Sequence, residues 1–170
     1  MSYLDLVYRF GIAAICLGLC MLILELFLKF PIRRIIKHLI LLLFVIYIFF
    51  ILYVTLYFHR SQHYGFNFVP FSDIVQCLKS KQYFDYFQFI LANFMLFIPF
   101  GFLYPLIFHK KFKNTVSIGA ASVICIETLQ VVLQRGIFDI NDILYNTVGI
   151  CIGYFCAHLL QTGLKMKNDI

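Results

Sequence analysis

The chain has 170 residues, of which 62% are hydrophobic and only 13% are charged, and its formal net charge at pH 7 is +6. Soluble domains carry about 25% charged residues, so this chain has too little polar surface to cover a water-soluble globule. We interpret the basic excess as a determinant of membrane topology, because no basic stripe is long enough to bind nucleic acid. The composition predicts an all-α membrane protein surrounded by a lipid bilayer.

Five apolar stretches are each close to the roughly 20 residues that about 30 Å of hydrocarbon requires. They predict a bundle of about five transmembrane helices over residues 6–28, 39–58, 86–108, 114–134 and 143–161. Basic rather than small residues follow the first stretch, so we expect it to remain as an anchor and not to be removed as a signal peptide.

The expected organisation has three regions. Two N-terminal transmembrane helices occupy 1–58, a core with an outer loop and three transmembrane helices occupies 59–161, and a short basic tail occupies 162–170. If successive loops alternate across the membrane, nine of the 14 Lys and Arg residues fall on one side. The positive-inside rule makes that side cytoplasmic, which predicts an outside N-terminus and a cytoplasmic C-terminus in a cell membrane.

One acid lies in the first stretch. Glu25 precedes Lys29 by four residues, a spacing that places both side chains on one helix face. We interpret them as an interface pair at the helix end.

The loop before the third stretch contains Asn67 and Pro70, followed by Ser72 and Asp73. Pro70 keeps the residue before it extended, and Ser72 or Asp73 is suited to begin a short helix lying at the membrane interface. Two interpretations stay open: a connection that follows the membrane surface, or a lid over the outer end of the bundle.

The third stretch carries Asn93 and Gly101 on one helix face, with Pro99 between them. Pro99 removes one backbone hydrogen bond and predicts a kink. Counting from the helix ends, Asn93 lies near the depth expected for Gln130 and Asn146.

The fourth stretch contains Glu127, followed at helical spacing by Gln130. A carboxylate near the middle of a span costs about 2.5–3.5 kcal/mol and normally has a partner inside the bundle. The functional interpretation is a ligand contact or a proton carrier. The structural alternative is a neutral, hydrogen-bonded side chain that fixes packing.

The fifth stretch opens with Asp139 and Asp142, and Asn146, Gly149 and Gly153 follow Asp142 on one helical face. Asp139 is suited to cap the helix, and the GxxxG step of the two glycines lets another helix approach closely. Capping does not account for Asn146, one turn deeper on the face of the glycines.

A divalent cation held by Glu127, Asp139 and Asp142 is a further interpretation, but Arg135 offers these acids a counter-charge. The five histidines show no metal-ligand spacing, and most of the cysteines lie in apolar runs, where they act as small hydrophobes. We therefore expect no metal and no cofactor.

Taken together, four segments resemble the VanZ family, small bacterial membrane proteins named after a teicoplanin-resistance determinant. The matching pieces are Asn67-Phe-Val-Pro70-Phe71 with Ile74, Asn93-Phe-Met-Leu-Phe97-Ile-Pro99-Phe-Gly101-Phe, Glu127-Thr-Leu-Gln130, and Arg135 followed by Asp139-Ile-Asn-Asp142-Ile-Leu-Tyr-Asn146-Thr-Val-Gly149 with Gly153. They cover about residues 60–154 in the family's order and spacing, whereas the first stretch and the tail lie outside them. The resemblance implies a multi-helix bacterial cell-membrane protein linked to tolerance of teicoplanin-type glycopeptides, and it supplies no reaction.

The predicted topology places the polar motif residues on the outer side of the membrane or in the outer halves of the last three stretches. These residues are Asn67, Pro70, Asn93, Glu127, Gln130, Arg135, Asp139, Asp142 and Asn146. We favour a non-enzymatic site that binds a peptidoglycan precursor, a lipoglycopeptide or another lipid-linked molecule.

Two other functions stay open. In a membrane enzyme acting on a lipid-linked cell-wall precursor, Glu127 or Asp142 would be the acid or base and Arg135 would hold an anionic group. No nucleophile with a recognisable base partner is visible in the sequence, which weighs against that alternative. A transporter or channel subunit gains little support from five stretches without a repeat.

Overall fold

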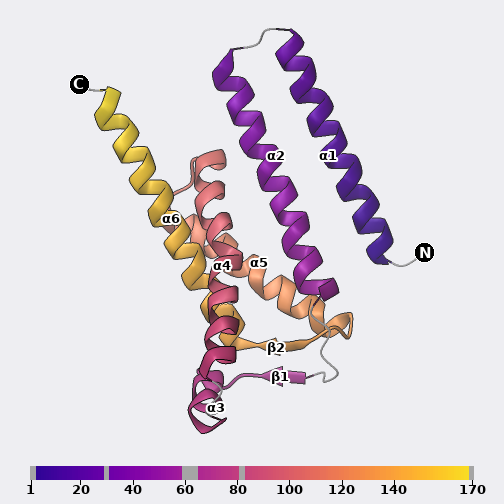
Figure 1. Cartoon of the computed structure of the whole chain (residues 1–170), viewed down its shortest axis with the longest axis vertical. Helices are drawn as coiled ribbons and strands as arrows, with labels where there is room; N and C mark the ends of the chain where they lie inside the picture. The colour runs from indigo at the N-terminus through magenta and orange to yellow at the C-terminus, as the bar shows by residue number, and fades with distance from the viewer. Residues whose placement is uncertain (1–2, 29–30, 59–64, 81–82, 169–170) are drawn as a thin grey trace. The chain divides into compact units, whose positions relative to one another are not determined.

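The computed structural model describes the backbone of residues 3–28, 31–58, 65–80 and 83–168 (Figure 1). The chain divides into two compact units, Met1–Phe58 and His59–Ile170. Two antiparallel helices form the first unit, whereas the second combines four helices with a pair of short strands.

Helices make up most of the chain. They are α1 (Tyr3–Phe27), α2 (Ile32–Tyr53) with the π-helical turn η1 (Val54–Phe58), α3 (Ser72–Ser80), α4 (Tyr83–Phe108), α5 (Phe112–Val132) and α6 (Ile140–Asn168). Among the described residues, four segments are long and apolar enough to cross a membrane, namely Arg34–Leu56, Tyr83–Phe108, Phe112–Val132 and Ile140–Gly163. In α1, a shorter segment, Ile15–Phe27, is apolar. The first stretch predicted from the sequence covers residues 6–28, and the side chains at its start lie outside the described ones. The chain is therefore an all-α membrane bundle, which confirms the predicted fold class.

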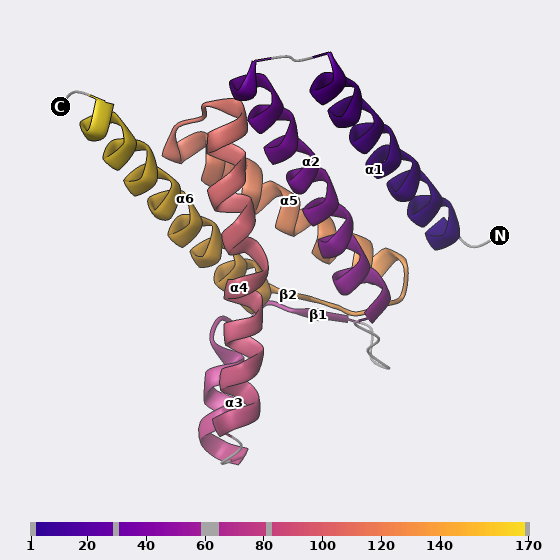
Figure 2. The ribbon, with the colours of Figure 1, turned by 45° about the horizontal axis from the view of Figure 1, so that its top comes forward.

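A two-stranded parallel ladder joins two distant parts of the second unit. The strands β1 (Gly65–Asn67) and β2 (Ile137–Asp139) run side by side (Figure 2), with Asn67 opposite Asp139. These strands are not predictable from the sequence, because three residues are too few to show the alternation of apolar and polar side chains that marks a strand.

Two helix boundaries bear on the sequence-based expectations. The short helix α3 begins at Ser72, as expected for the residue after Pro70 and Phe71. Helix α6, in contrast, continues past 161 to Asn168, because the Leu, Lys and Met residues of the expected tail are good helix formers. The basic tail therefore prolongs the last helix.

Among the described elements, the pair α4 and α6 makes the most extensive contact. A Cβ atom added at Gly149 would clash with the backbone carbonyl of Phe94, and one at Gly153 would clash with the backbone of α4. On α4, a Cβ atom added at Gly101 would clash with the backbone carbonyl of Ile150 in α6. Only hydrogen atoms fit at these three positions, so the glycines set how closely the two helices approach.

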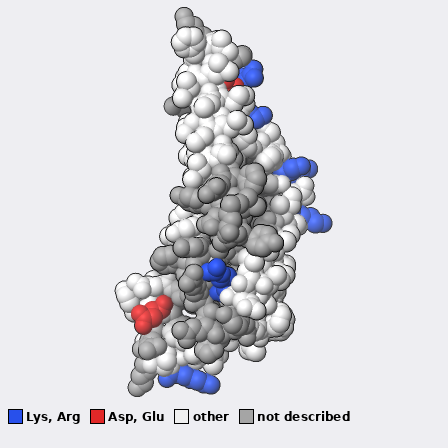
Figure 3. All heavy atoms as spheres, turned by 90° about the vertical axis from the view of Figure 1, so that its right-hand side faces the viewer, with Lys and Arg blue, Asp and Glu red and all other residues white. Residues whose placement is uncertain are grey.

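The core of the second unit is small and lies between α4, α5 and α6. Phe97, Val123 and Ile150 are at most 2% exposed. Many large apolar side chains elsewhere are exposed, including Val132 and Leu159. On the face in Figure 3, residues other than Lys, Arg, Asp and Glu make up most of the described surface. Such an apolar exterior fits a surrounding of lipid chains.

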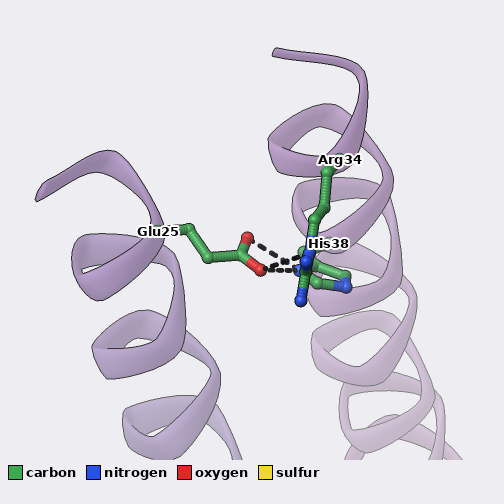
Figure 4. A network of polar contacts seen from close by, with 3 residues as sticks. All are labelled: Glu25, Arg34 and His38. Atoms are coloured by element: carbon green, nitrogen blue, oxygen red, sulfur yellow. Dashed lines mark hydrogen bonds and ion pairs between the residues drawn. The ribbon is translucent and has the colours of Figure 1, made fainter. Parts of the chain in front are cut away.

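The first unit contains a buried acid between its two helices. Glu25 of α1 is only 3% exposed. As Figure 4 shows, it faces α2, where His38 Nδ1 lies 2.7 Å and Arg34 Nε 3.2 Å from its carboxylate. Lys29, the partner expected from the sequence, lies outside the described residues. Glu25 therefore ties α1 to α2 through two described basic side chains.

Candidate functional site

The ladder of β1 and β2 brings two of the predicted site residues together. Asn67 and Asp139 are partners in the parallel register, and Asn67 Nδ2 donates a hydrogen bond of 2.9 Å to Asp139 Oδ2. The same amide group also donates to Ser72 Oγ over 2.9 Å. The loop after β1 is thereby fastened to the start of α6.

Asn141 fixes the turn that contains Pro70. Its side chain is fully buried, its Nδ2 donates to Ser72 Oγ at 2.8 Å and to the Val69 carbonyl at 3.3 Å, and its Oδ1 accepts the backbone N–H of Phe71. Phe71 has a φ of 59°, a conformation that non-glycine residues seldom adopt. The bond from Asn141 holds this strained residue in place.

Asn141 is not among the site residues expected from the sequence, where it stands only within the family-like segment that begins at Asp139. The signal that would have identified it is its place as a third polar residue at the head of an otherwise apolar stretch. Asn141 is the most connected side chain at this end of α6.

Asp139 links α6 to α5. As the residue before α6, it accepts the backbone N–H of Asn141 on Oδ1 at 2.8 Å, which is the capping role expected for it. Its own backbone N–H donates to Glu127 Oε2 at 3.2 Å. Glu127 is 4% exposed, so this buried acid in the last third of α5 has a backbone partner directly before α6.

The turn from α5 to β2 rests on the backbone of Gln130. Its carbonyl accepts the N–H groups of Arg135 at 2.7 Å and of Gly136 at 3.3 Å, and its side chain is buried. Arg135 is half-buried in this turn. It forms no ion pair with the described acids, so the counter-charge expected from it is not seen among the described contacts.

Asn93 and Asp142 connect α4 to α6. Asn93 Nδ2 donates to Asp142 Oδ1 over 2.7 Å. Asn146 follows one turn later on α6 and is buried, and its Oδ1 has no hydrogen-bond partner among the described residues. Pro99 lies further along α4, inside the continuous helix.

These side chains form one group, which we call the polar cluster. It consists of Asn67, Ser72, Asp73, Asn93, Glu127, Asp139, Asn141 and Asp142. Its four carboxylates interact electrostatically, since Asp142 lies within range of both Asp73 and Asp139, and Glu127 lies within range of Asp139 and Asp142. Burial, together with the nearby Asp139, raises the pKa of the Asp73 carboxyl above its usual value.

No described Lys, Arg or His forms an ion pair with the carboxylates of the polar cluster; the recorded ion pairs join Glu25 to Arg34 and His38. Over the same residues, no three His, Cys, Asp or Glu side chains are placed to hold a metal ion. The cluster is thus a half-buried, acidic group of carboxylates and amides at one end of α4, α5 and α6.

Comparisons with known proteins identify the family of the chain. No curated protein and no solved structure matches the chain. The family model described as VanZ/LLP1 matches residues 39–161, a range that contains every residue of the polar cluster and begins inside α2. The chain therefore belongs to the VanZ/LLP1 family.

Proposed function

We propose that this membrane protein lies in a bacterial cell membrane and lowers sensitivity to teicoplanin-type glycopeptides by binding a lipid-linked or cell-envelope molecule at an outer-leaflet site. The site is the polar cluster together with Gln130, Arg135 and Asn146. The observation that carries the proposal is the convergence of hydrogen bonds from β1, α4, α5 and α6 on Asp139 and Asp142. Intramembrane acids gathered in this way commonly mark a functional site.

The outer placement follows from the distribution of basic residues. Lys110, Lys111 and Lys113 lie at the connection of α4 and α5, whereas the polar cluster lies at the opposite ends of these helices. The positive-inside rule then puts the cluster outside, where teicoplanin and the peptidoglycan precursors that it binds are found.

The orientation has a direct test. A reporter active only in the cytoplasm should work when it is inserted at Lys111 and fail when it is inserted at Gln76. The reverse pattern would move the polar cluster to the cytoplasmic side and end the outer-leaflet proposal.

The hydrogen bonds favour a binder over an enzyme. Ser72 contributes an aliphatic hydroxyl to the polar cluster, but its Oγ accepts bonds from the amides of both Asn67 and Asn141. These two bonds occupy both lone pairs, which makes the oxygen a poor nucleophile. The enzymatic alternative keeps Glu127 or Asp142 as acid or base and Arg135 as the anion contact.

The function is tested with Glu127→Gln, Asp142→Asn and Arg135→Ala, each expressed at equal membrane abundance and scored for teicoplanin susceptibility. We expect Asp142→Asn to raise susceptibility most, because it removes a charge and alters the contact with Asn93. Asp85→Asn, at the exposed start of α4, is the matched control. Unchanged susceptibility in all three variants would refute the proposal.

Mass spectrometry of lipids and wall precursors separates the two mechanisms. A binder leaves the set of lipid-linked species the same with and without the protein. A new or missing species that depends on Glu127 or Asp142 would establish the enzyme instead.

A further inference from the structure

Three buried oxygen atoms in and beside the polar cluster have no hydrogen-bond partner among the described residues. They are Asp73 Oδ2, Tyr145 Oη and Asn146 Oδ1. Tyr145 is 5% exposed and Asn146 is 4% exposed, so bulk water reaches neither residue freely. Buried polar atoms in folded proteins nearly always have a partner, so these three oxygens are candidates to accept hydrogen bonds from a bound group.

The hydroxyl of Tyr145 points toward the acids. Side chains on a helix lean toward its N-terminus, and Tyr145 lies one turn after Asn141. Its hydroxyl lies within electrostatic range of Asp73, Asp139 and Asp142. The ring packs edge-on against Phe94 of α4, with centroids 5.6 Å apart, which fixes the direction of the hydroxyl.

Asn146 lies one turn after Asp142 on the same face of α6. The same lean of helical side chains carries its amide back toward that carboxylate. Asp142 already accepts a bond from Asn93 on Oδ1, so Asn146 Oδ1 is left as an acceptor without a described donor.

The charges around these atoms favour one class of hydrogen-bond donor. Four carboxylates lie in the cluster, and none has an ion pair with a described base. A phosphate brings negative charge and offers mainly acceptors, a quaternary ammonium has no N–H, and a single hydroxyl donates once. A primary ammonium is positive and has three donors and no acceptor, which matches three unpartnered acceptors beside uncompensated acids.

We propose that the polar cluster, extended by Tyr145 and Asn146, binds a primary ammonium group. The group is carried by an envelope lipid, by a lipid-linked molecule or by a soluble amine. This inference rests on the proposed function, in which this end of the bundle is a ligand site, and it names the chemical group that the site recognises.

The test uses the full-length protein in detergent and native mass spectrometry. The probes are phosphatidylethanolamine, phosphatidylcholine and phosphatidylglycerol with identical acyl chains. We expect phosphatidylethanolamine to bind at least tenfold more tightly than the other two. Ethanolamine should compete for the site and choline should not, and binding of ethanolamine without the lipid would identify a soluble amine as the source.

Substitution of Tyr145 tests whether its hydroxyl contributes to the binding of the ammonium group. Tyr145→Phe removes only the unpartnered hydroxyl, so the affinity for ethanolamine should fall by about fivefold, the factor that corresponds to one ordinary hydrogen bond. The unliganded melting temperature should stay unchanged or rise. Tyr154→Phe, on the same helix with its ring against Phe112, is the matched control and should keep the wild-type affinity.

The outcomes distinguish this inference from the proposed function. Equal binding of phosphatidylethanolamine and phosphatidylcholine, or selective binding of phosphatidylglycerol, overturns the ammonium site. Stabilisation by Mg²⁺ or Ca²⁺ that Tyr145→Phe abolishes overturns it in favour of a metal. If no amine binds while Asp142→Asn still raises teicoplanin susceptibility, the ammonium inference fails and the proposed function stands. If ethanolamine binds selectively while no variant changes teicoplanin susceptibility, the ammonium inference stands and the proposed function fails.

Discussion

Asn93 and Asp142 lie on two different apolar helices and are joined by a hydrogen bond of 2.7 Å. The bond crosses the contact between α4 and α6, at the end of that contact where the two helices meet the polar cluster. Leaving a buried carboxyl without its hydrogen-bond donor costs free energy, so this pair helps to hold the polar cluster together.

Asn93→Leu should lower the free energy of unfolding by about 1–3 kcal/mol, because it leaves the Asp142 carboxyl buried without this donor. Unfolding of the purified protein in mixed detergent measures the change. A double-mutant cycle with Asp142→Asn should give a coupling energy of about 0.5–3 kcal/mol. Ser122→Ala, which removes only a bond of α5 to its own backbone, is the control, and zero coupling would contradict the pairing.

Gly149→Ala should destabilise the second unit, since the added methyl group meets the carbonyl of Phe94. Overpacked contacts cost about 1–3 kcal/mol, and here the obstacle is backbone and not a flexible side chain. Thermal unfolding or the yield of folded protein measures the loss. Gly163→Ala on the same helix meets nothing within 4 Å and should be neutral or stabilising, so equal damage from both variants would disprove the close approach.

Asp73 predicts a dependence of stability on pH. Its carboxyl has a raised pKa because it is partly buried and faces Asp139, so the folded state binds the proton more tightly than the unfolded state. The stabilisation from this group is fully present below its ordinary pKa of 3.8 and is lost as pH rises through the folded value. Asp73→Asn should flatten the melting temperature across this range and raise it at neutral pH.

The control for this titration is Asp85→Asn, at the exposed start of α4. It should leave the pH profile unchanged. A wild-type melting temperature that rises steadily from pH 4 to pH 8, with the same rise in Asp73→Asn, would show that Asp73 is not the group responsible.

In the first unit, removing the acid Glu25 should cost less stability than removing both of its basic partners, Arg34 and His38. Arg34 and His38 have side chains that are 54% and 35% exposed, whereas that of Glu25 is 4% exposed. Glu25→Gln leaves two bases that water still solvates, so it should cost little. Removing both bases leaves a carboxylate buried and unpaired, which costs several kcal/mol.

Proteolysis of the α1–α2 hairpin in detergent measures the difference. Arg34→Ala combined with His38→Ala should open the hairpin more than Glu25→Gln does. Lys37→Ala, an exposed base on α2, serves as control. Equal effects of Glu25→Gln and of the double base variant would contradict the arrangement in which Glu25 is buried and its two bases are exposed.

The sequence could predict the features that depend on neighbouring residues. Apolar length predicts the helices α2, α4, α5 and α6, and the position of Asp139 before an apolar run predicts its capping bond. The spacing of Gly149 and Gly153 was enough to suggest a close helix contact, although the sequence could not say that α4 is the partner.

The remaining parts of the site depend on contacts between distant residues. Asn67 and Asp139 are 72 residues apart, and no local pattern of three residues reveals that they pair. Asn141 cannot be identified from local sequence, because the three partners of its side chain, Val69, Phe71 and Ser72, lie 69 to 72 residues earlier in the chain. For Glu25, spacing favoured a neighbour on the same helix, whereas its described partners come from the next one.

The parallel pairing of β1 with β2 also sets when the polar cluster can assemble during synthesis of the chain. The strand at Gly65–Asn67 leaves the ribosome long before Ile137–Asp139, and α3, α4 and α5 lie between them. Contacts of such long sequence separation form slowly and late. A nascent chain that stops before α6 thus contains three of the four family segments and still lacks the assembled polar cluster, because the start of α6 brings Asn141 and Asp142, which bond to the earlier segments.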